Sequence, residues 1–372
     1  MATVVLLLLA SIIFNPFLRK TNRKQDTANN NDASSLPPLT VIVLANNNAE
    51  ALDAHLPIIL TQDYPAGYEV VVVGEKGDIP TETVLKSYRK STNLYSTYIP
   101  KRSLFMSKPK LAVALGVKAA HNEWIILIGA ECKPSSDMWL RSIASKMDCD
   151  ATIVLGYSNY SNEANQYYRF NRLRNACYLL RKATHDTAYC ACGKNIAFRR
   201  SEFIGTDGYR GNLQYVNGEY HFIINKLASK LKTRIATDAN AVVIEDSPTS
   251  KIWHNSNIAY ESIRRHLTHR KALSMLYYTD LVMMYTNYTV IVAAVILSAL
   301  SSRWLLLAVG CTALIATVVI RSVIAAKAYA RFGEDLSAWR TVIYEISIIW
   351  HRMSSRLRYA LSDKYNFTTH KL

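Results

Sequence analysis

Short apolar runs alternate with amphipathic stretches along the first half of the chain. The runs are short enough to be buried strands, and they cover residues 41–45, 69–73, 94–99, 125–128 and 151–155. Helical patterns lie between and after them, at residues 49–61, 81–89, 109–120, 136–147 and 162–182. This alternation predicts an α/β fold with a mostly parallel, doubly wound sheet.

Three longer apolar runs without charged side chains lie outside this region. They cover residues 1–18, 281–302 and 304–320, and runs near 20 residues are typical of helices that span a membrane. Basic residues follow the first run instead of preceding it, which favours an anchor over a cleaved signal peptide. Only Arg303 separates the other two runs, so we expect a transmembrane hairpin over residues 281–325.

The charges beside these runs predict one orientation. Arginines and lysines follow position 18, precede position 281 and follow position 320. Positively charged flanks stay in the cytoplasm, so we expect an integral protein of the inner (cytoplasmic) membrane with its main domain in the cytoplasm. The net charge of +16, from 44 basic and 28 acidic residues, follows the same boundaries. It favours a membrane surface over nucleic acid as the partner, because no nucleic-acid module is recognisable.

The same patterns divide the chain into six segments. These are an anchor (1–18), a flexible linker (19–37), an α/β domain (38–250), a basic interfacial segment (251–280), the transmembrane hairpin (281–325) and an amphipathic helix (332–358). The last helix has apolar residues three or four apart and suits the bilayer interface; packing onto the α/β domain is the open alternative. Cys190 and Cys192 lie too close for usual zinc-ligand spacing, so we interpret them as buried free thiols.

One predicted strand ends in an acid. The apolar run at 125–128 is followed by Glu131, and Pro134 then prevents simple continuation. Open α/β sheets bind ligands beyond the carboxyl ends of their strands. The preceding helix, at 109–120, carries Lys110 in its first turn. A βαβ unit whose loop contains a glutamate by chance would give the same pattern, so these residues alone leave the question open.

Five segments, taken in order, resemble a known family. They are LTVIVLANNNAE (39–50), QDYPAGYEVVVVGEKGD (62–78), residues 110–134, GKNIAFRRSEF (193–203) and YESIRRHL (260–267). The order is similar to that of membrane-bound members of glycosyltransferase family 2, which have the GT-A fold. The resemblance implies an inverting hexosyltransferase that uses a nucleotide sugar, with a UDP-sugar as the first expectation. Its acceptor would be a lipid-linked or surface-polysaccharide glycan at the cytoplasmic face.

The resemblance also implies where the donor binds. Asn47, Glu75 and Asp78 fall where relatives hold the nucleotide base, and Lys110 matches a lysine near the nucleotide. The family's Asp-x-Asp motif ends at Glu131, which would therefore hold a divalent metal, Mg²⁺ or Mn²⁺.

The remaining matched positions concern the transfer itself. Glu219 or His221 would take the proton of the acceptor hydroxyl. Arg264 and Arg265 would neutralise the donor phosphates, with His266 beside them.

Three of these motifs are only half matched. Gly129, Tyr220 and Ser262 stand where relatives carry another acid, a continued acidic cluster and a glutamine. The alternative is therefore a catalytically inactive relative that binds a glycan lipid or scaffolds a polysaccharide assembly complex.

Overall fold

The computed structural model describes residues 2–18, 36–103 and 105–363. The chain divides into two compact units. We call residues 22–268 with 355–372 the α/β unit, and residues 1–21 with 269–354 the helical unit, and describe each by itself.

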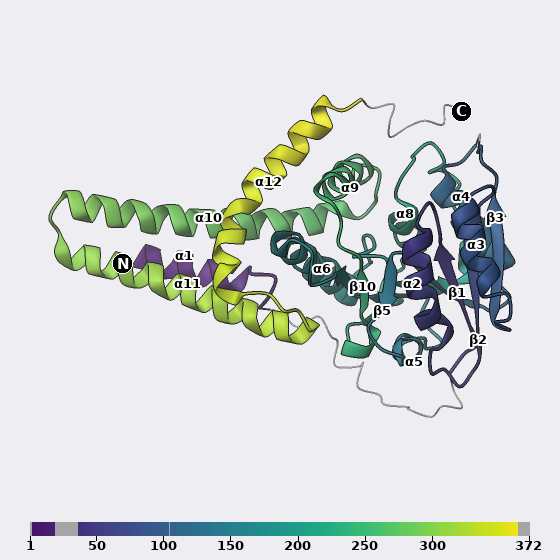
Figure 1. The fold of residues 1–372 in the computed structure, drawn as a ribbon. Coiled ribbons are helices and arrows are strands. Elements are labelled where there is room, and N and C mark those ends of the chain that lie inside the picture. Colours follow the sequence, from purple (N-terminus) through teal and green to yellow (C-terminus); the bar gives the residue numbers. More distant parts are fainter. Residues whose placement is uncertain (1, 19–35, 104, 364–372) are drawn as a thin grey trace. The chain divides into compact units, whose positions relative to one another are not determined.

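A seven-stranded sheet forms the centre of the α/β unit, with the strand order β3-β2-β1-β4-β8-β6-β9 (Figure 1). Its strands are β1 (Leu39–Leu44), β2 (Tyr68–Glu75), β3 (Leu94–Ile99), β4 (Trp124–Gly129), β6 (Ile153–Gly156), β8 (Ile196–Arg199) and β9 (Thr233–Ala236). All neighbours pair in parallel except β8, which is antiparallel to both β4 and β6. The predicted mostly parallel sheet is confirmed.

The helices of this unit follow the expected alternation. They are α2 (Ala49–Leu60), α3 (Ile79–Ser87), α4 (Lys108–Ala119), α5 (Trp139–Ala144), α6 (Gln166–His185), α7 (Arg200–Gly205), α8 (Glu219–Leu227) and α9 (Ser250–Ile263). The helix expected over 136–147 is shorter, because the Ser136 hydroxyl accepts from the Met138 backbone N–H at 3.1 Å and makes a turn there instead. Cys190 and Cys192 are free and buried, as the sequence predicts.

A second, three-stranded sheet lies beside the carboxyl end of β4. It has the order β5-β10-β7, with β5 (Cys132–Pro134), β10 (Val243–Glu245) and β7 (Ser158–Tyr160). The antiparallel register of β10 and β5 places Glu245 opposite Cys132. The backbone N–H of Asp246 also donates to the Glu131 carbonyl at 2.9 Å. Glu245 is thereby brought next to Glu131, although the two residues are 114 positions apart in the sequence.

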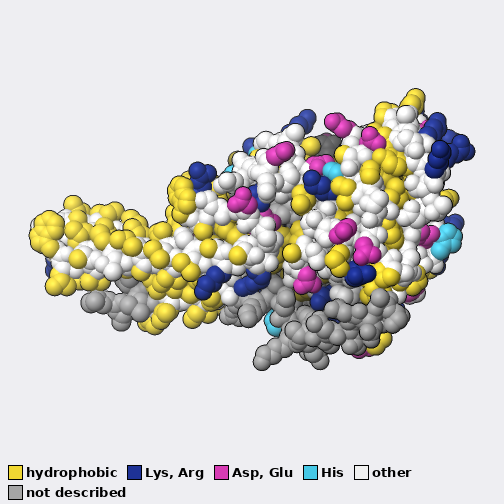
Figure 2. Space-filling view, turned by 60° about the horizontal axis from the view of Figure 1, so that its bottom comes forward, with side chains coloured by type: hydrophobic (Ala, Val, Ile, Leu, Met, Phe, Trp, Pro, Cys, Tyr) yellow, Lys and Arg dark blue, Asp and Glu magenta, His cyan; other side chains and the backbone are white. Residues whose placement is uncertain are grey.

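The helical unit contains long apolar helices. Its elements are α1 (Ala2–Ile13), α10 (Arg270–Leu300), α11 (Trp304–Phe332), the 3₁₀ turn Ala338–Arg340, and α12 (Thr341–Leu361) as far as residue 354. By length and composition, Leu273–Leu300 and Trp304–Phe332 could each cross a membrane. Hydrophobic side chains cover most of the visible surface of this hairpin in Figure 2. The N-terminal anchor stays a prediction, because α1 has only 12 residues.

The helices of this unit differ in their bounds from the predicted segments. The hairpin helices extend beyond 281–325, because the absence of charge marks the apolar middle of a helix and not its ends. Residue 332 belongs to α11, which ends at Gly333 with a left-handed φ of 66°. The amphipathic helix expected over 332–358 therefore begins only at Thr341.

A buried ion pair joins three helices of this unit. The Arg321 side chain has no exposed surface, and its Nε and Nη2 donate to the Glu345 carboxylate at 2.7 Å each. Its Nη1 donates to the Ser11 carbonyl at 2.8 Å. A charge buried among apolar helices is tolerated when it is paired and hydrogen-bonded in this way, so Arg321 holds α1, α11 and α12 together.

Candidate active site

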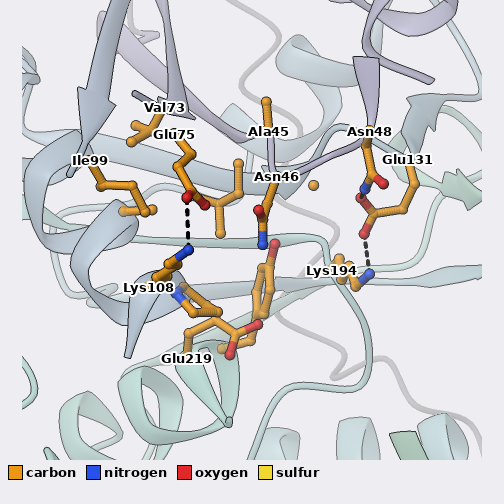
Figure 3. A pocket seen from close by; sticks show the side chains of 15 residues that line it. Ala45, Asn46, Asn48, Val73, Glu75, Ile99, Lys108, Glu131, Lys194 and Glu219 are labelled. Atoms are coloured by element: carbon orange, nitrogen blue, oxygen red, sulfur yellow. Dashed lines mark hydrogen bonds and ion pairs between the residues drawn. The ribbon is translucent and has the colours of Figure 1, made fainter. Parts of the chain in front are cut away.

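A cleft of about 190 Å³ opens at the carboxyl ends of β1, β2 and β4. This is the edge at which open α/β sheets bind ligands. The end of β2, the segments after β1 and β4, the start of α4, the loop before β8 and the start of α8 all contribute side chains (Figure 3). The polar ones are Asn46, Asn48, Glu75, Lys108, Glu131, Lys194, Glu219 and Tyr220.

Glu131 leaves β4 and turns its carboxylate toward a lysine. Its Oε1 forms a short ion pair with the Lys194 ammonium, and its Oε2 accepts from Asn48 Nδ2 at 3.3 Å. Burial alone would raise the pKa of the Glu131 carboxyl, but the Lys194 charge outweighs burial and holds that pKa below its ordinary value. Glu131 is therefore ionised at neutral pH.

Gly129 makes this conformation of Glu131 possible. A Cβ atom at position 129 would lie 2.5 Å from Glu131 Oε1 and 2.7 Å from Oε2. A side chain there would require the flexible Glu131 carboxylate to shift away from its present position.

Lys194 lies between two carboxylates. Besides Glu131, its ammonium is 3.9 Å from Glu245 Oε2, and its backbone N–H donates to Ser158 Oγ at 3.2 Å. Burial would lower the pKa of Lys194, but the two carboxylates reverse the direction and raise it. The lysine stays protonated throughout the physiological range.

Behind Lys194, Glu245 is almost fully buried and paired a second time. Its Oε1 accepts from Ser158 Oγ at 2.9 Å and forms a short ion pair with Arg172 Nη2. Arg172 also donates to the Tyr160 hydroxyl at 2.9 Å. Charges of alternating sign thus run from the cleft into the interior, in the order Glu131, Lys194, Glu245 and Arg172. We call these four residues the cleft ion series.

This donor set does not fit a divalent metal. Mg²⁺ and Mn²⁺ prefer several oxygen ligands, whereas the Glu131 carboxylate faces an ammonium group. Over residues 2–18, 36–103 and 105–363, no group of three or more His, Cys, Asp or Glu side chains gathers to hold a metal. The expected role of Glu131 as a metal ligand stays a prediction, and no chemical step below depends on it.

A second ion pair lies across the cleft. Lys108, the first residue of α4, donates to Glu75 Oε1 at 2.7 Å (Figure 3). Glu75 is the last residue of β2 and was expected at this site. Lys108 was not expected; the signal that could have found it is the sequence Lys-Pro-Lys at 108–110.

Lys110, the lysine that the resemblance selected, does not line the cleft. Residues two apart on a helix point in different directions, and the Lys110 side chain is fully buried. Its ammonium donates to the carbonyls of Asn212 at 2.7 Å and Tyr215 at 2.5 Å, and lies 4.7 Å from the centre of the Phe222 ring. Burial lowers its pKa to about 8 against the opposing charge of Glu219. Lys110 therefore fixes the segment that leads into α8.

Of the two candidate bases, Glu219 lines the cleft and His221 does not. Glu219 begins α8, directly after Gly218 with its left-handed φ of 97°. Two positions later His221 packs edge-on against the Tyr260 ring, with 5.4 Å between the ring centres. Burial, together with the charge of Arg172, lowers the pKa of His221 to about 4, so its imidazole is neutral at pH 7.

Asn47 and Asp78 lie beside the cleft without lining it. The backbone N–H of Asn47 donates to Asp78 Oδ2 at 3.3 Å. Asp78 also caps α3, since its Oδ1 accepts from the Thr81 backbone N–H at 3.4 Å, and its Oδ2 accepts from the Thr81 hydroxyl at 2.7 Å. Together they tie the loop after β1 to the loop after β2. The side chains that enter the cleft from the first loop are those of Asn46 and Asn48.

The three residues expected to neutralise phosphates lie after α9. Arg264 pairs with Glu261 at 2.9 Å, Arg265 is exposed, and His266 stacks on Tyr215 with 4.3 Å between the ring centres. None of the three lines the cleft. Through Tyr215, His266 contacts the same segment before α8 that Lys110 holds.

Lys194 and Glu245 are the main residues that the sequence patterns missed. Lys194 lies within the segment GKNIAFRRSEF, but nothing in the sequence pairs it with an acid 63 positions earlier. Glu245 ends an apolar run, Ala241 to Ile244, just as Glu131 follows the run at 125–128. An acid after an apolar run could therefore have identified Glu245 as a candidate site residue in the same way as Glu131.

Comparison with known proteins supports the fold. No protein-family model and no curated protein matches the chain. The mannosyltransferase PcManGT from Pyrobaculum calidifontis, solved in complex with GDP-Man and Mn²⁺, has a similar structure. The two chains are 16% identical, with a TM-score of 0.54, over 96% of this chain and 98% of PcManGT. This chain therefore has the fold of a glycosyltransferase.

A weaker likeness is found with S. aureus TarS 1-349 in complex with UDP-GlcNAc. It has a TM-score of 0.43 and 13% identity, over 84% of this chain and 92% of TarS 1-349.

Proposed function

We propose that the protein is a membrane-anchored inverting glycosyltransferase of family 2 with the GT-A fold. The observation that carries the proposal is the cleft at the carboxyl ends of β1, β2 and β4, where Lys108 and Lys194 share one space with Glu219. Fixed cations suit a diphosphate, and a carboxylate suits the removal of a proton. The likeness to PcManGT supports the fold that this function requires.

The donor is a nucleotide sugar. A UDP-sugar follows from the sequence resemblance, and the complex of PcManGT with GDP-Man makes a GDP-sugar the second choice. Glu75 and Lys108 border the donor on one side of the cleft, and Glu131 and Lys194 border it on the other.

The transfer is a displacement at the anomeric carbon. The acceptor hydroxyl oxygen attacks that carbon from the face opposite the diphosphate, while its proton passes to Glu219. The bond from the anomeric carbon to the diphosphate oxygen breaks, and its electron pair leaves with the nucleoside diphosphate. The cations of the cleft stabilise the negative charge that develops there.

Turnover of a donor panel tests the activity. The full chain in detergent, given UDP- and GDP-sugars with and without Mn²⁺, should release nucleoside diphosphate from at least one donor. Glu219→Gln should slow this release by about 10²–10⁴-fold, as expected for loss of a general base. Glu202→Gln is the matched control, since Glu202 is an exposed acid in the first turn of α7 and should change nothing.

Inactivity across the panel with the fold intact would contradict the enzyme. The inactive relative that binds a glycan lipid or scaffolds an assembly complex would then be favoured.

The acceptor is a lipid-linked or surface-polysaccharide glycan at the cytoplasmic face of the inner membrane. Two helices long and apolar enough to cross a membrane support this proposal. So does an exposed apolar face of α12, made by Ile343, Ile346, Trp350 and Met353.

Reporter fusions test the orientation. Fusions at position 30, in the 301–303 turn and at the C-terminus should read cytoplasm, outside and cytoplasm. A fusion within 38–270 that reads outside would refute the topology.

A further inference from the structure

We propose that Lys194 is the resident cation of the cleft: it binds the donor diphosphate directly, and donor binding needs no divalent metal. The choice of ligand rests on the proposed function. The placement of the cation rests on the cleft ion series alone.

The Lys194 ammonium is held from one side and open on the other. Its side chain is 36% exposed, whereas that of Glu245 behind it is 4% exposed. An ammonium carries three N–H donors. Glu131 accepts one of them, and Glu245 at 3.9 Å lies beyond hydrogen-bond reach. The lysine is thus positioned by carboxylates and still has N–H groups to offer a ligand in the cleft.

The charges of the series leave no demand for a metal. Glu131 and Glu245 contribute two negative charges, and Lys194 and Arg172 contribute two positive ones. A divalent ion at Glu131 would replace or repel the lysine that already neutralises it.

Among the described residues, only one acid follows β4 at this edge of the cleft. The Glu131 carboxylate lies over Gly129, where a Cβ atom would be 2.5 Å from Oε1. A side chain at position 129 would therefore require the Glu131 carboxylate to shift from this position. The segment after β4 thus offers a metal one carboxylate, which is already paired with Lys194.

Calorimetry of the full chain in detergent, with UDP and GDP as probes, tests this inference. Wild-type affinity should agree within about twofold in EDTA and in excess Mn²⁺ or Mg²⁺. Lys194→Met should weaken binding at least about tenfold, and Lys194→Arg, which keeps the charge, should weaken it less than about threefold. The matched control is Lys182→Met, since Lys182 pairs with one carboxylate, Asp186, at 2.7 Å and does not line the cleft. It should bind as the wild type does.

Glu131→Gln separates the two accounts by the sign of its effect. If Glu131 were a metal ligand, the substitution would weaken binding and abolish the response to Mn²⁺. If Lys194 is the cation, the substitution removes one of its anionic partners and leaves a net positive charge. Binding of the nucleoside diphosphate in EDTA should then strengthen by about two- to tenfold.

The outcomes are distinguishable. Wild-type binding that appears only with metal overturns this inference and leaves the proposed function standing, as does Lys194→Met binding at wild-type affinity. Absence of UDP and GDP binding in every condition overturns the proposed function itself. If Lys194→Met fails to fold, the wild-type comparison and the sign of the Glu131→Gln effect still decide.

Discussion

The molecule contains two ion-pair systems of similar chemistry, one with a fully enclosed cation and one with a cation that is partly exposed to a cleft. In the helical unit, Arg321 has no exposed surface, and its three nitrogens donate to Glu345 and to the Ser11 carbonyl. In the α/β unit, Lys194 also meets two partners, but its side chain is 36% exposed and faces a cleft. The comparison teaches that pairing alone does not assign a role to a buried charge. The role of such a cation depends on how many of its N–H donors the pairing leaves available for a ligand.

The residue types fit this difference. The guanidinium of arginine is a rigid fork that binds a carboxylate with two parallel hydrogen bonds. The ammonium of lysine is a point charge with rotatable donors. Arg321 is therefore suited to a closed structural contact, whereas Lys194 can keep its carboxylates and contact a ligand as well.

The largest loss of stability is expected at Arg321, the cation without exposed surface. Glu345→Ala should destabilise the helical unit by about 3–5 kcal/mol, because it leaves Arg321 buried and unpaired. The double variant Arg321→Met with Glu345→Leu should recover most of that loss. Thermal unfolding in detergent measures both. A cost below about 1 kcal/mol for Glu345→Ala would mean that water reaches the arginine, and the contrast with Lys194 would disappear.

A smaller loss of stability is expected at the open cation. Lys194→Met should cost about 1–2 kcal/mol of unfolding free energy, because Glu245 keeps Arg172 and Ser158 as partners. The same unfolding experiment measures it. A cost as large as that of Glu345→Ala would make Lys194 a structural residue like Arg321.

The smallest expected effect is on the pH dependence of the free energy of unfolding, where a third cation, Lys110, differs from Lys194. Burial lowers the pKa of Lys110 from 10.5 to about 8. Between these two values the unfolded chain binds more protons than the folded one, so this group makes stability rise with pH across that window. Lys110→Met should remove the rise, as urea unfolding at a series of pH values would detect.

Lys194 contributes with the opposite sign. Its pKa is raised above 10.5, so its stabilisation is complete below that pH and is lost as pH rises through the folded-state pKa. If both lysines gave the same slope, the assignment of Lys110 as dominated by burial and of Lys194 as dominated by ion pairs would be wrong.

The sequence predicted the part of the site that strand ends create. Glu75 and Glu131 line the cleft because each stands where a parallel strand stops. Glu131 is visible without a structure as an acid after an apolar run, whereas Glu75 was selected by the family resemblance. The α/β fold was predicted because short apolar runs alternate with helical patterns along the chain. The antiparallel strand β8 was missed, since its four residues, which lead directly into α7, are too few to carry a periodic signal.

The residues that the sequence misplaced depend on direction and on distant contacts. Lys108 and Lys110 differ by two positions on one helix, and the phase of the helix alone decides which enters the cleft. Glu219 and His221 differ in the same way. Lys194 acquires its role only from Glu131 and Glu245, which the two sheets bring to it from 63 and 51 positions away.

The most direct test of the account is an experimental structure of the full chain with UDP or GDP bound in the presence of excess Mn²⁺. The account predicts the diphosphate in the cleft, with a phosphate oxygen within hydrogen-bond distance of Lys194 Nζ while Glu131 and Glu245 still flank the lysine. A Mn²⁺ ion between Glu131 and the diphosphate, with Lys194 displaced, would contradict it.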